Sequence, residues 1–271
     1  MTLVKKATGV LEEFDENKIV NSLVRTGIPL NTAREVASKI IPKTKVISTK
    51  EIYERVLGEL KRVNIAYAEA YRLREAIMEL GPTGFPFEKY IGEILRALNF
   101  QVTLNHVLKG RCVSHEVDIL AVKNGRKILV ECKYRNDWGG RVNVKTVLYV
   151  YARFLDLIDR LDEAWIVTNA KFTLEAVKYG KCVRLKLVGW NYPPGNGLEE
   201  LIRRTRKYPL TVLLTIQMVD YKILLDYGIT TVDKLASLTP ESLSELLGIG
   251  YEEAFKIVSD ARNFMKVLTH M

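Results

Sequence analysis

Apolar residues recur with a helical period through most of the first 80 residues. Asp15 is placed to cap the first helix, and Ser48 with Glu51 three positions later forms a capping box. Apolar residues at 3–4 and 10–11 predict a short hairpin ahead of the helices. Four helices are expected in this segment: one from residue 16, one over 32–40, one from residue 48 or 49, and one over 66–80.

The pattern changes after residue 86, where short apolar runs alternate with helical ones. Strands that alternate with helices indicate an α/β sheet. The predicted helices cover residues 87–98, 144–160 and 173–179, and the predicted strands cover residues 117–123, 127–134, 164–168 and 184–188.

Two clusters of glycine and proline divide the chain, one at 81–86 and one at 193–197. The segment after the second cluster has only helices and turns, with similar turns at 228–230 and 248–250. The sequence predicts a multi-domain α and α/β protein: a helical domain over 1–82, a central α/β sheet domain over 83–194 and a C-terminal helical module over 195–271.

One predicted hairpin carries the candidate chemistry. Asn124-Gly125 favours a two-residue type I′ turn, because both central positions of that turn need a positive φ. With this turn Asp118 lies opposite Glu131, and the two-residue period of a strand places Lys133 on the same face as Glu131. Cys132 then points to the other face.

Two carboxylates that face each other in an apolar sheet repel, and a divalent cation would relieve that repulsion. Mg²⁺ is typically held by one or two carboxylates, water and phosphate oxygens, and a neighbouring lysine can hold a phosphate oxygen or orient water. The alternative is a structural ion pair between Lys133 and Glu131 on an exposed strand, with Asp118 capping a loop.

Val117-Asp118, followed by Glu131-Cys132-Lys133, resembles the motif of the PD-(D/E)XK nucleases. The segments 84–100 and 166–172 resemble the Mrr-like and archaeal Holliday-junction-resolvase-like branch of that family. Val117 stands where the family name has proline. The resemblance implies a restriction-endonuclease-like fold and metal-dependent DNA cleavage.

The resemblance also assigns roles to residues. It implies that Asp118, Glu131 and the backbone carbonyl of Cys132 hold Mg²⁺, for which Mn²⁺ can substitute. It makes Lys133 a catalytic base or phosphate clamp and Glu88 an outer ligand or second-metal residue. His115 is expected at a strand start rather than in the site.

The N-terminal segment resembles an ATP cone, a nucleotide-binding regulatory module. The resemblance carries nucleotide contacts to Lys6, Glu12, Lys18 and Thr49, with ATP or dATP as the ligand. Ala7-Thr8 stand where the family usually has Arg-Asp, so one phosphate-binding charge is missing. A cone fold without nucleotide affinity is therefore the alternative.

The last 55 or so residues resemble helix-hairpin-helix units, whose turns can bind phosphates through backbone amides. Few basic residues lie near Gly248, so contact with DNA and contact with protein both stay open. Overall the chain of 271 residues has a net charge of +9. The excess of lysine and arginine lies in the central segment, which suits either a polyanionic partner such as DNA or a charged surface that only keeps the protein in solution.

Three cysteines without a CxxC spacing and three histidines argue against a disulfide framework or a zinc site. No long apolar run or signal-peptide pattern predicts a membrane segment, and we expect a cytoplasmic protein. The leading hypothesis is a Mg²⁺-dependent DNA endonuclease regulated by nucleotide and acting as a homodimer. The alternative is a non-catalytic, nucleotide-responsive DNA-binding protein that uses a nuclease fold as a platform.

Overall fold

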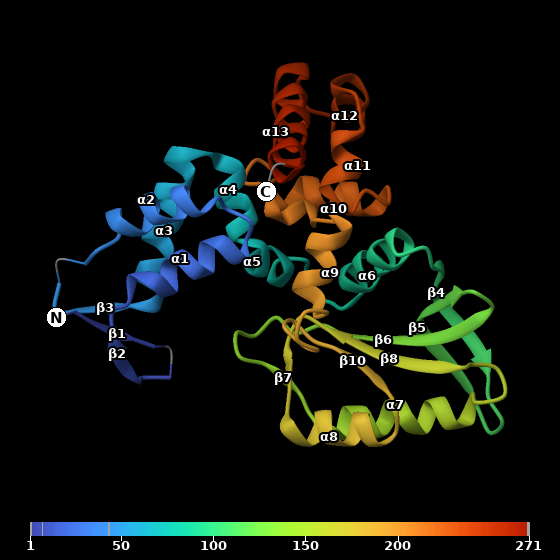
Figure 1. The fold of residues 1–271 in the computed structure, drawn as a ribbon. Coiled ribbons are helices and arrows are strands. Elements are labelled where there is room, and N and C mark those ends of the chain that lie inside the picture. The colour runs from blue at the N-terminus through green and yellow to red at the C-terminus, as the bar shows by residue number, and fades with distance from the viewer. Residues whose placement is uncertain (1, 7, 43, 270–271) are drawn as a thin grey trace.

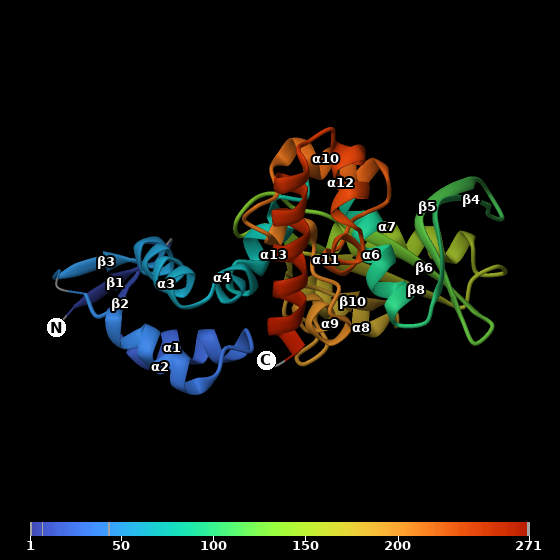
Figure 2. The same cartoon turned by 90° about the horizontal axis from the view of Figure 1, so that it is seen from above.

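The computed structural model describes residues 2–6, 8–42 and 44–269. It has the predicted multi-domain α and α/β architecture, with an N-terminal part, a central sheet covered by helices and a C-terminal group of helices (Figures 1 and 2). None of the described helices combines the length and the hydropathy needed to cross a bilayer.

The N-terminal part joins a small sheet to a group of helices. Its sheet has the order β2-β1-β3, in which β1 pairs antiparallel with β2 and parallel with β3. The Asp15 carboxylate accepts a hydrogen bond from the Asn17 N–H, and Ser48 with Glu51 forms the predicted capping box. The elements are β1 (Leu3–Lys5), β2 (Leu11–Glu13), α1 (Glu16–Arg25), α2 (Leu30–Lys39), β3 (Val46–Ser48) and α3 (Thr49–Val63).

The fourth helix expected from the sequence is divided in two. Helix α4 (Ile65–Tyr71) ends at Arg72, and α5 (Leu73–Met78) follows directly. The Arg72 guanidinium donates to the Thr211 carbonyl at 2.7 Å and to Glu79 at 2.8 Å. The expectation of one continuous helix was therefore wrong, because these tertiary contacts hold the chain where no proline or glycine marks a break.

The central part is built on a five-stranded sheet of order β10-β8-β6-β5-β4. The pairs β10·β8 and β8·β6 are parallel, and β6·β5 and β5·β4 are antiparallel. The strand β4, at the sheet edge, was not expected from the sequence. The sheet strands are β4 (Gln101–Lys109), β5 (Ser114–Lys123), β6 (Arg126–Lys133), β8 (Glu163–Thr168) and β10 (Lys186–Val188), and β7 (Arg141–Val142) pairs separately with β9 (Lys171–Phe172).

Helices cover both faces of this sheet (Figure 1). Helix α6 (Phe85–Ala97) packs on one face, where Ile119, Val130 and Cys132 are buried. Helices α7 (Val144–Asp156) and α8 (Leu174–Cys182) cover the other, over Leu129 and Ile166. The two-sided burial explains the apolar strands from which a sheet was predicted.

The C-terminal helices pack against α5 and α6. The Tyr90 hydroxyl donates to the Lys207 carbonyl at 2.6 Å, and the Thr211 hydroxyl donates to the Ala76 carbonyl at 2.7 Å. Because these side chains are buried, their hydrogen bonds fix the two parts to each other. The elements are α9 (Leu198–Thr205), the 3₁₀ turn η1 (Leu210–Val212), α10 (Met218–Asp226), α11 (Val232–Ala236), α12 (Pro240–Leu247) and α13 (Tyr251–Thr269).

A buried carboxyl lies where α4 meets the C-terminal part. Glu69 is 1% exposed and accepts a hydrogen bond from the Leu214 N–H at 2.9 Å. Its pKa is raised from the ordinary 4.5 to about 7, mainly by burial and less strongly by the charge of the nearby Asp260, against the effect of that hydrogen bond. Between pH 4.5 and about 7, Glu69 is therefore protonated in the folded protein and ionised in the unfolded chain.

This proton predicts a pH-dependent stability. Between pH 4.5 and about 7 the folded state holds more protons than the unfolded state, so the free energy of unfolding falls as pH rises. The Glu69→Gln variant lacks this cost, and its stability relative to wild type should increase by roughly 3 kcal/mol from pH 4 to pH 8. Urea unfolding at both pH values measures the change. Glu54→Gln, at an exposed pair with Lys50, is the control, and an equal pH response of wild type and Glu69→Gln would contradict the assignment.

Candidate active site

The turn between β5 and β6 has the backbone geometry that Asn124-Gly125 predicts. Asn124 has φ 52° and Gly125 has φ 78°, both left-handed. The ladder pairs Lys123 with Arg126 and continues in the same register to Ile119 opposite Val130. The next positions along the two strands are Asp118 and Glu131, so the turn places them at the open end of the ladder.

Asp118 contacts β6 through the backbone of Cys132. Its Oδ2 accepts a hydrogen bond from the Cys132 N–H at 2.7 Å. Because a residue in an antiparallel ladder directs its N–H and C=O at the same neighbour, the Cys132 carbonyl also lies on the Asp118 side. The Cys132 side chain is buried in the core beneath α6, as predicted.

The electrostatic surroundings of Asp118 are unfavourable to its charge. Its pKa is raised to about 6, first by burial and then by repulsion from Glu131, with a smaller contribution from Glu88. The hydrogen bond from Cys132 and the charge of Lys133 act in the opposite direction. The positive side chains of the site therefore do not fully neutralise the negative charge around Asp118. A divalent cation there would relieve the repulsion.

Glu131 is buried, with 2% of its surface exposed, and both of its carboxylate oxygens have partners. Lys133 Nζ donates to Oε1 at 2.6 Å, and Arg153 Nη1 donates to Oε2 at 2.5 Å. The second Nη of Arg153 donates to the Glu116 carbonyl. A cation that binds Glu131 must therefore compete with the charges of Lys133 and Arg153.

Lys133 lies at the end of β6 and is partly exposed. Burial disfavours its positive charge, but attraction to Glu131 and Asp118 outweighs burial and raises its pKa above the ordinary 10.5. The ammonium group is therefore charged at neutral pH. It can bind a phosphate oxygen that approaches from solvent.

Glu88 lies in the first turn of α6 and faces the same group of charges. Its carboxylate accepts from Asn105 Nδ2 at 3.4 Å. Burial raises its pKa, and repulsion from Glu131 and Glu116 adds to this effect. Glu88 is therefore close enough to the carboxylates of the hairpin for their negative charges to repel one another.

The residues fit an oxygen-ligated cation better than an enclosed metal site. Among the described residues, no three His, Cys, Asp or Glu side chains are grouped closely enough to hold an ion. Mg²⁺ usually keeps several waters and takes only one or two carboxylates with phosphate oxygens. Asp118, the Cys132 carbonyl and Glu131 offer such a set, once Glu131 releases one of its partners.

Arg153 was not foreseen as part of the site. It lies on α7, three residues after the buried Val150, on an otherwise apolar helix face. A charged residue on the apolar face of this helix is the signal that could have identified Arg153, because buried charges are almost always paired. His115, by contrast, contacts Asp156 at 2.7 Å and lies outside the carboxylate group, as expected.

In the N-terminal part, three of the four predicted nucleotide contacts come together. The Glu12 carboxylate pairs with Lys6 Nζ at 2.7 Å and with Lys18 Nζ at 3.1 Å. Hydrogen bonds from these two lysines lower the pKa of Glu12. The fourth, Thr49, is the first residue of α3 and directly follows Ser48, which pairs with Lys5 in the β1·β3 ladder. Thr49 also lines a cavity, and Ala7 lies outside the described residues.

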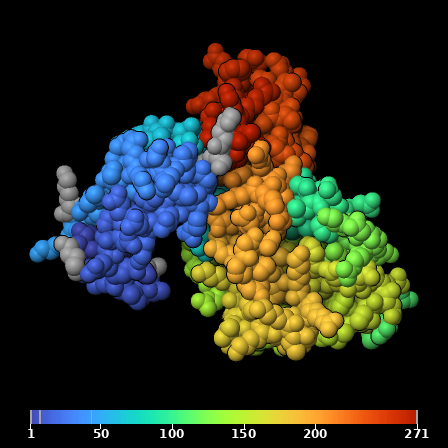
Figure 3. All heavy atoms as spheres, in the orientation of Figure 1, coloured from blue at the N-terminus to red at the C-terminus, as the bar shows by residue number. Residues whose placement is uncertain are grey.

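That cavity, of about 590 Å³, lies between the N-terminal part and the sheet domain, where Figure 3 shows the surface hollowed. The Arg74 guanidinium lies 5.4 Å from the Trp138 ring and 6.0 Å from the Trp190 ring. Thr49, Lys50 and Arg25 line the side formed by the N-terminal helices. The cavity therefore combines cations with aromatic rings from two parts of the chain.

The five-stranded sheet and the acidic group at its hairpin define an α/β domain of the restriction-endonuclease type. A family model described as a restriction endonuclease, the Mrr catalytic domain, matches residues 82–191. The model of the ATP cone domain matches residues 2–77. The chain belongs to this restriction endonuclease family and carries an N-terminal ATP cone.

Two relatives match about two thirds of this chain. An uncharacterized protein of Archaeoglobus fulgidus is 32% identical over 176 residues, which are 64% of this chain and 98% of the relative. A crystal structure of a protein of unknown function matches with a TM-score of 0.60 and 31% identity, over 68% of this chain and 100% of that one. Neither relative has a stated activity.

Proposed function

We propose that this protein is a divalent-cation-dependent DNA endonuclease that hydrolyses phosphodiester bonds. The observation that carries the proposal is the grouping of Asp118, Glu131 and Lys133 at the open end of the β5–β6 hairpin. Membership of the restriction endonuclease family supports the reaction class.

Each residue has a role in this proposal. Asp118, Glu131 and the Cys132 carbonyl hold Mg²⁺ or Mn²⁺, and Glu88 acts as an outer ligand. When bound, such a cation polarises a phosphate and activates water. Lys133 binds a non-bridging phosphate oxygen, and the ion pair with Arg153 fixes the orientation of the Glu131 carboxylate.

The surface beside the site suits DNA. The strand β6 leads into a loop that carries Arg135 and Trp138 and ends at Arg141, the first residue of β7, and the Trp138 side chain is 62% exposed. Arginines can bind backbone phosphates, and an exposed indole can stack on an unpaired base. A plasmid-nicking assay with Mg²⁺, and with EDTA in its place, tests the proposal directly.

One observation favours the non-catalytic alternative. Glu131 is already neutralised by Lys133 and Arg153, an arrangement that also suits a retained fold without a bound cation. In that case the protein binds DNA equally well in Mg²⁺ and in EDTA and does not cut it. Filter binding in parallel with the nicking assay distinguishes the two functions.

We further propose that ATP or dATP bound by the cone regulates cleavage. Lys6 and Lys18 can bind the phosphates of the nucleotide once their ion pairs with Glu12 are broken. The cavity lined by Thr49 also reaches Trp138, which follows the catalytic strand. A nucleotide that extends into this cavity would therefore contact both the cone and the nuclease domain.

Nucleotide binding predicts a thermal shift. With ATP or dATP at one hundred times its Kd, the free energy of unfolding should rise by about 2.7 kcal/mol and the melting temperature by about 5 °C. Lys18→Ala and Thr49→Ala should each reduce the shift, whereas Lys39→Ala, at an exposed pair with Glu35, should not. The absence of binding heat and of any shift in wild type would exclude the nucleotide role.

Cleavage of both DNA strands needs two active sites, so we propose that the protein is a homodimer. We also propose that it is located in the cytoplasm. The resemblance of α12, Gly248 and α13 to a helix-hairpin-helix unit makes the C-terminal module a candidate second contact for DNA or protein. Light scattering of the purified chain measures the oligomeric state.

A further inference from the structure

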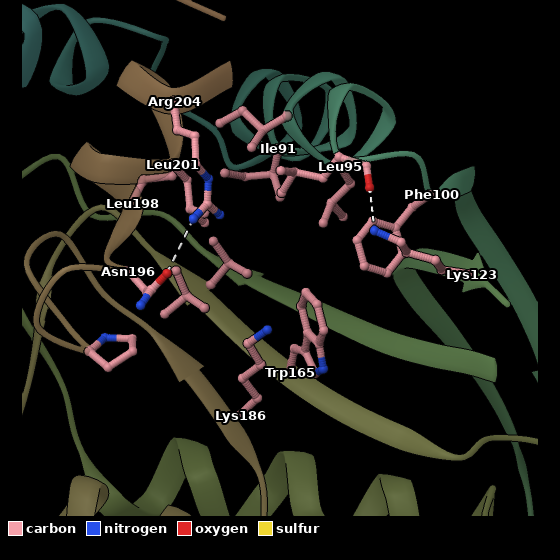
Figure 4. A pocket seen from close by; sticks show the side chains of 15 residues that line it. Ile91, Leu95, Phe100, Lys123, Trp165, Lys186, Asn196, Leu198, Leu201 and Arg204 are labelled. Carbon is pink, nitrogen blue, oxygen red and sulfur yellow. Dashed lines mark hydrogen bonds between the residues drawn. The ribbon is translucent and has the colours of Figure 1, made fainter. Parts of the chain in front are cut away.

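A second cavity, of about 470 Å³, lies between α6, α9 and the sheet (Figure 4). Its sheet side is formed mainly by β8 and β10, through Trp165, Val167, Lys186 and Val188, rather than by the hairpin that carries the candidate active site. None of the catalytic or nucleotide-contact residues named above lines it. Its volume falls in the range of small-molecule sites.

The wall of this cavity is mainly aliphatic. Helix α6 contributes Ile91 and Leu95, and α9 contributes Leu198 and Leu201, all of which Figure 4 shows around the opening. Unlike a planar aromatic surface, aliphatic side chains of this kind surround an alkyl chain without a preferred stacking geometry. The wall therefore favours a flexible apolar group.

Three cations, Lys123, Lys186 and Arg204, also line the cavity. Lys123 donates to the Leu98 carbonyl at 2.7 Å, and Arg204 donates to Asn196 at 3.3 Å. Within the part of the chain that the structure describes, none of the three forms an ion pair with a carboxylate. Their positive charge is therefore available to a ligand.

The carboxylate that attracts Lys186 is itself already paired. Glu163 pairs with Arg126 at 3.0 Å and accepts from Trp165 Nε1 at 2.9 Å. Burial lowers the pKa of Lys186, and repulsion from Arg204 and Lys123 adds to this effect, which attraction to Glu163 only partly offsets. An anion placed among the three cations would remove this repulsion.

The aromatic residues argue against a nucleobase as the ligand. Lys186 Nζ lies 3.6 Å from the centroid of the Trp165 ring and covers that face (Figure 4). Lys123 Nζ lies 4.8 Å from the centroid of the Phe100 ring. The two ammonium groups occupy positions that a stacked base would need.

We propose that this cavity binds an amphipathic organic anion, an alkyl chain that ends in a carboxylate or a phosphate. The chain lies against α6 and α9, and the head group contacts Lys186 and Arg204. Helix α6 also carries Glu88 at its other end, so a ligand here stabilises the helix that faces the candidate active site.

Calorimetry on the full chain tests the proposal with four probes: decanoate, decyl phosphate, 1-decanol and inorganic phosphate, all below micelle-forming concentrations. Saturable one-to-one binding of decanoate or decyl phosphate is expected, and the two arms identify the head group. Decanol or inorganic phosphate should bind at least about tenfold more weakly. No binding of either anion, or equal binding of decanol, would overturn the proposal.

Two variants locate the site. Lys186→Met keeps the side-chain stem and should weaken binding of the anion about tenfold, and Leu201→Trp should fill the cavity and block binding. Lys127→Met, at an exposed lysine of β6 that does not line the cavity, is the control. Lys186 forms no ion pair with the described carboxylates, and burial already disfavours its charge, so its variant should retain the wild-type melting temperature. Equal affinity of Lys186→Met and Lys127→Met would contradict the placement of the head group.

Discussion

Plasmid cleavage in Mg²⁺ is expected to fall by two to three orders of magnitude when Lys133 is replaced by alanine. A positioned cation at a phosphate, or a positioned proton-transfer group, typically contributes about that much to a hydrolytic rate. Lys133 is the one described side chain that contacts Glu131 and is also open to solvent, since Arg153 is buried. Among the described cations paired with Glu131, none besides Lys133 is exposed enough to take its place at the phosphate.

The measurement is the initial rate of nicking of a supercoiled plasmid. Lys39→Ala, an exposed lysine of the cone, should leave the rate unchanged. Because Glu131 keeps Arg153 as a partner, Lys133→Ala should remain folded, which circular dichroism can verify. Equal rates for wild type and Lys133→Ala would contradict the role of this residue in cleavage.

Replacing Arg153 with methionine should have the largest effect on stability. The change removes one partner of a buried ion pair and leaves Glu131 with a single cation in a low-dielectric environment. Loss of one partner from a buried pair typically lowers the free energy of unfolding by about 3 kcal/mol or more. Urea unfolding in EDTA measures this loss.

The effect of Mn²⁺ on the stability of Arg153→Met distinguishes a cation-binding site from a purely structural ion pair. If Glu131 is a cation ligand, Mn²⁺ should restore part of the stability that Arg153→Met loses, and should stabilise this variant more than wild type. Arg111→Met breaks an exposed pair with Asp159 and should cost much less stability than Arg153→Met, with no response to Mn²⁺. A loss of stability that Mn²⁺ does not change would instead favour a purely structural role for the pair, as in the platform hypothesis.

The hairpin that carries Asp118, Glu131 and Lys133 could be predicted because the residues that set its turn and register are close together in the sequence. Asn124-Gly125 sets the turn, the turn sets the register, and the register fixes which side chains lie opposite each other. The helix starts at Asp15 and Ser48 were predictable for the same reason, since each cap is made within a few residues of sequence.

Other features depend on contacts between distant segments. The break at Arg72 and the pairing of Arg153 with Glu131 are set by partners far along the chain. The strand β4 is different, because Val102 and Leu104 alternate with polar residues, so its signal was present and was overlooked.

The central claim is that Asp118, Glu131 and Lys133 form a cation-dependent site for DNA cleavage. The most direct test is anomalous scattering from crystals soaked in Mn²⁺. We predict a peak within coordination distance of the Asp118 carboxylate and the Cys132 carbonyl, with Glu131 turned from one of its present partners toward the ion. A Mn²⁺ soak that leaves the Glu131 pairs with Lys133 and Arg153 intact, with no peak beside Asp118, would contradict the claim.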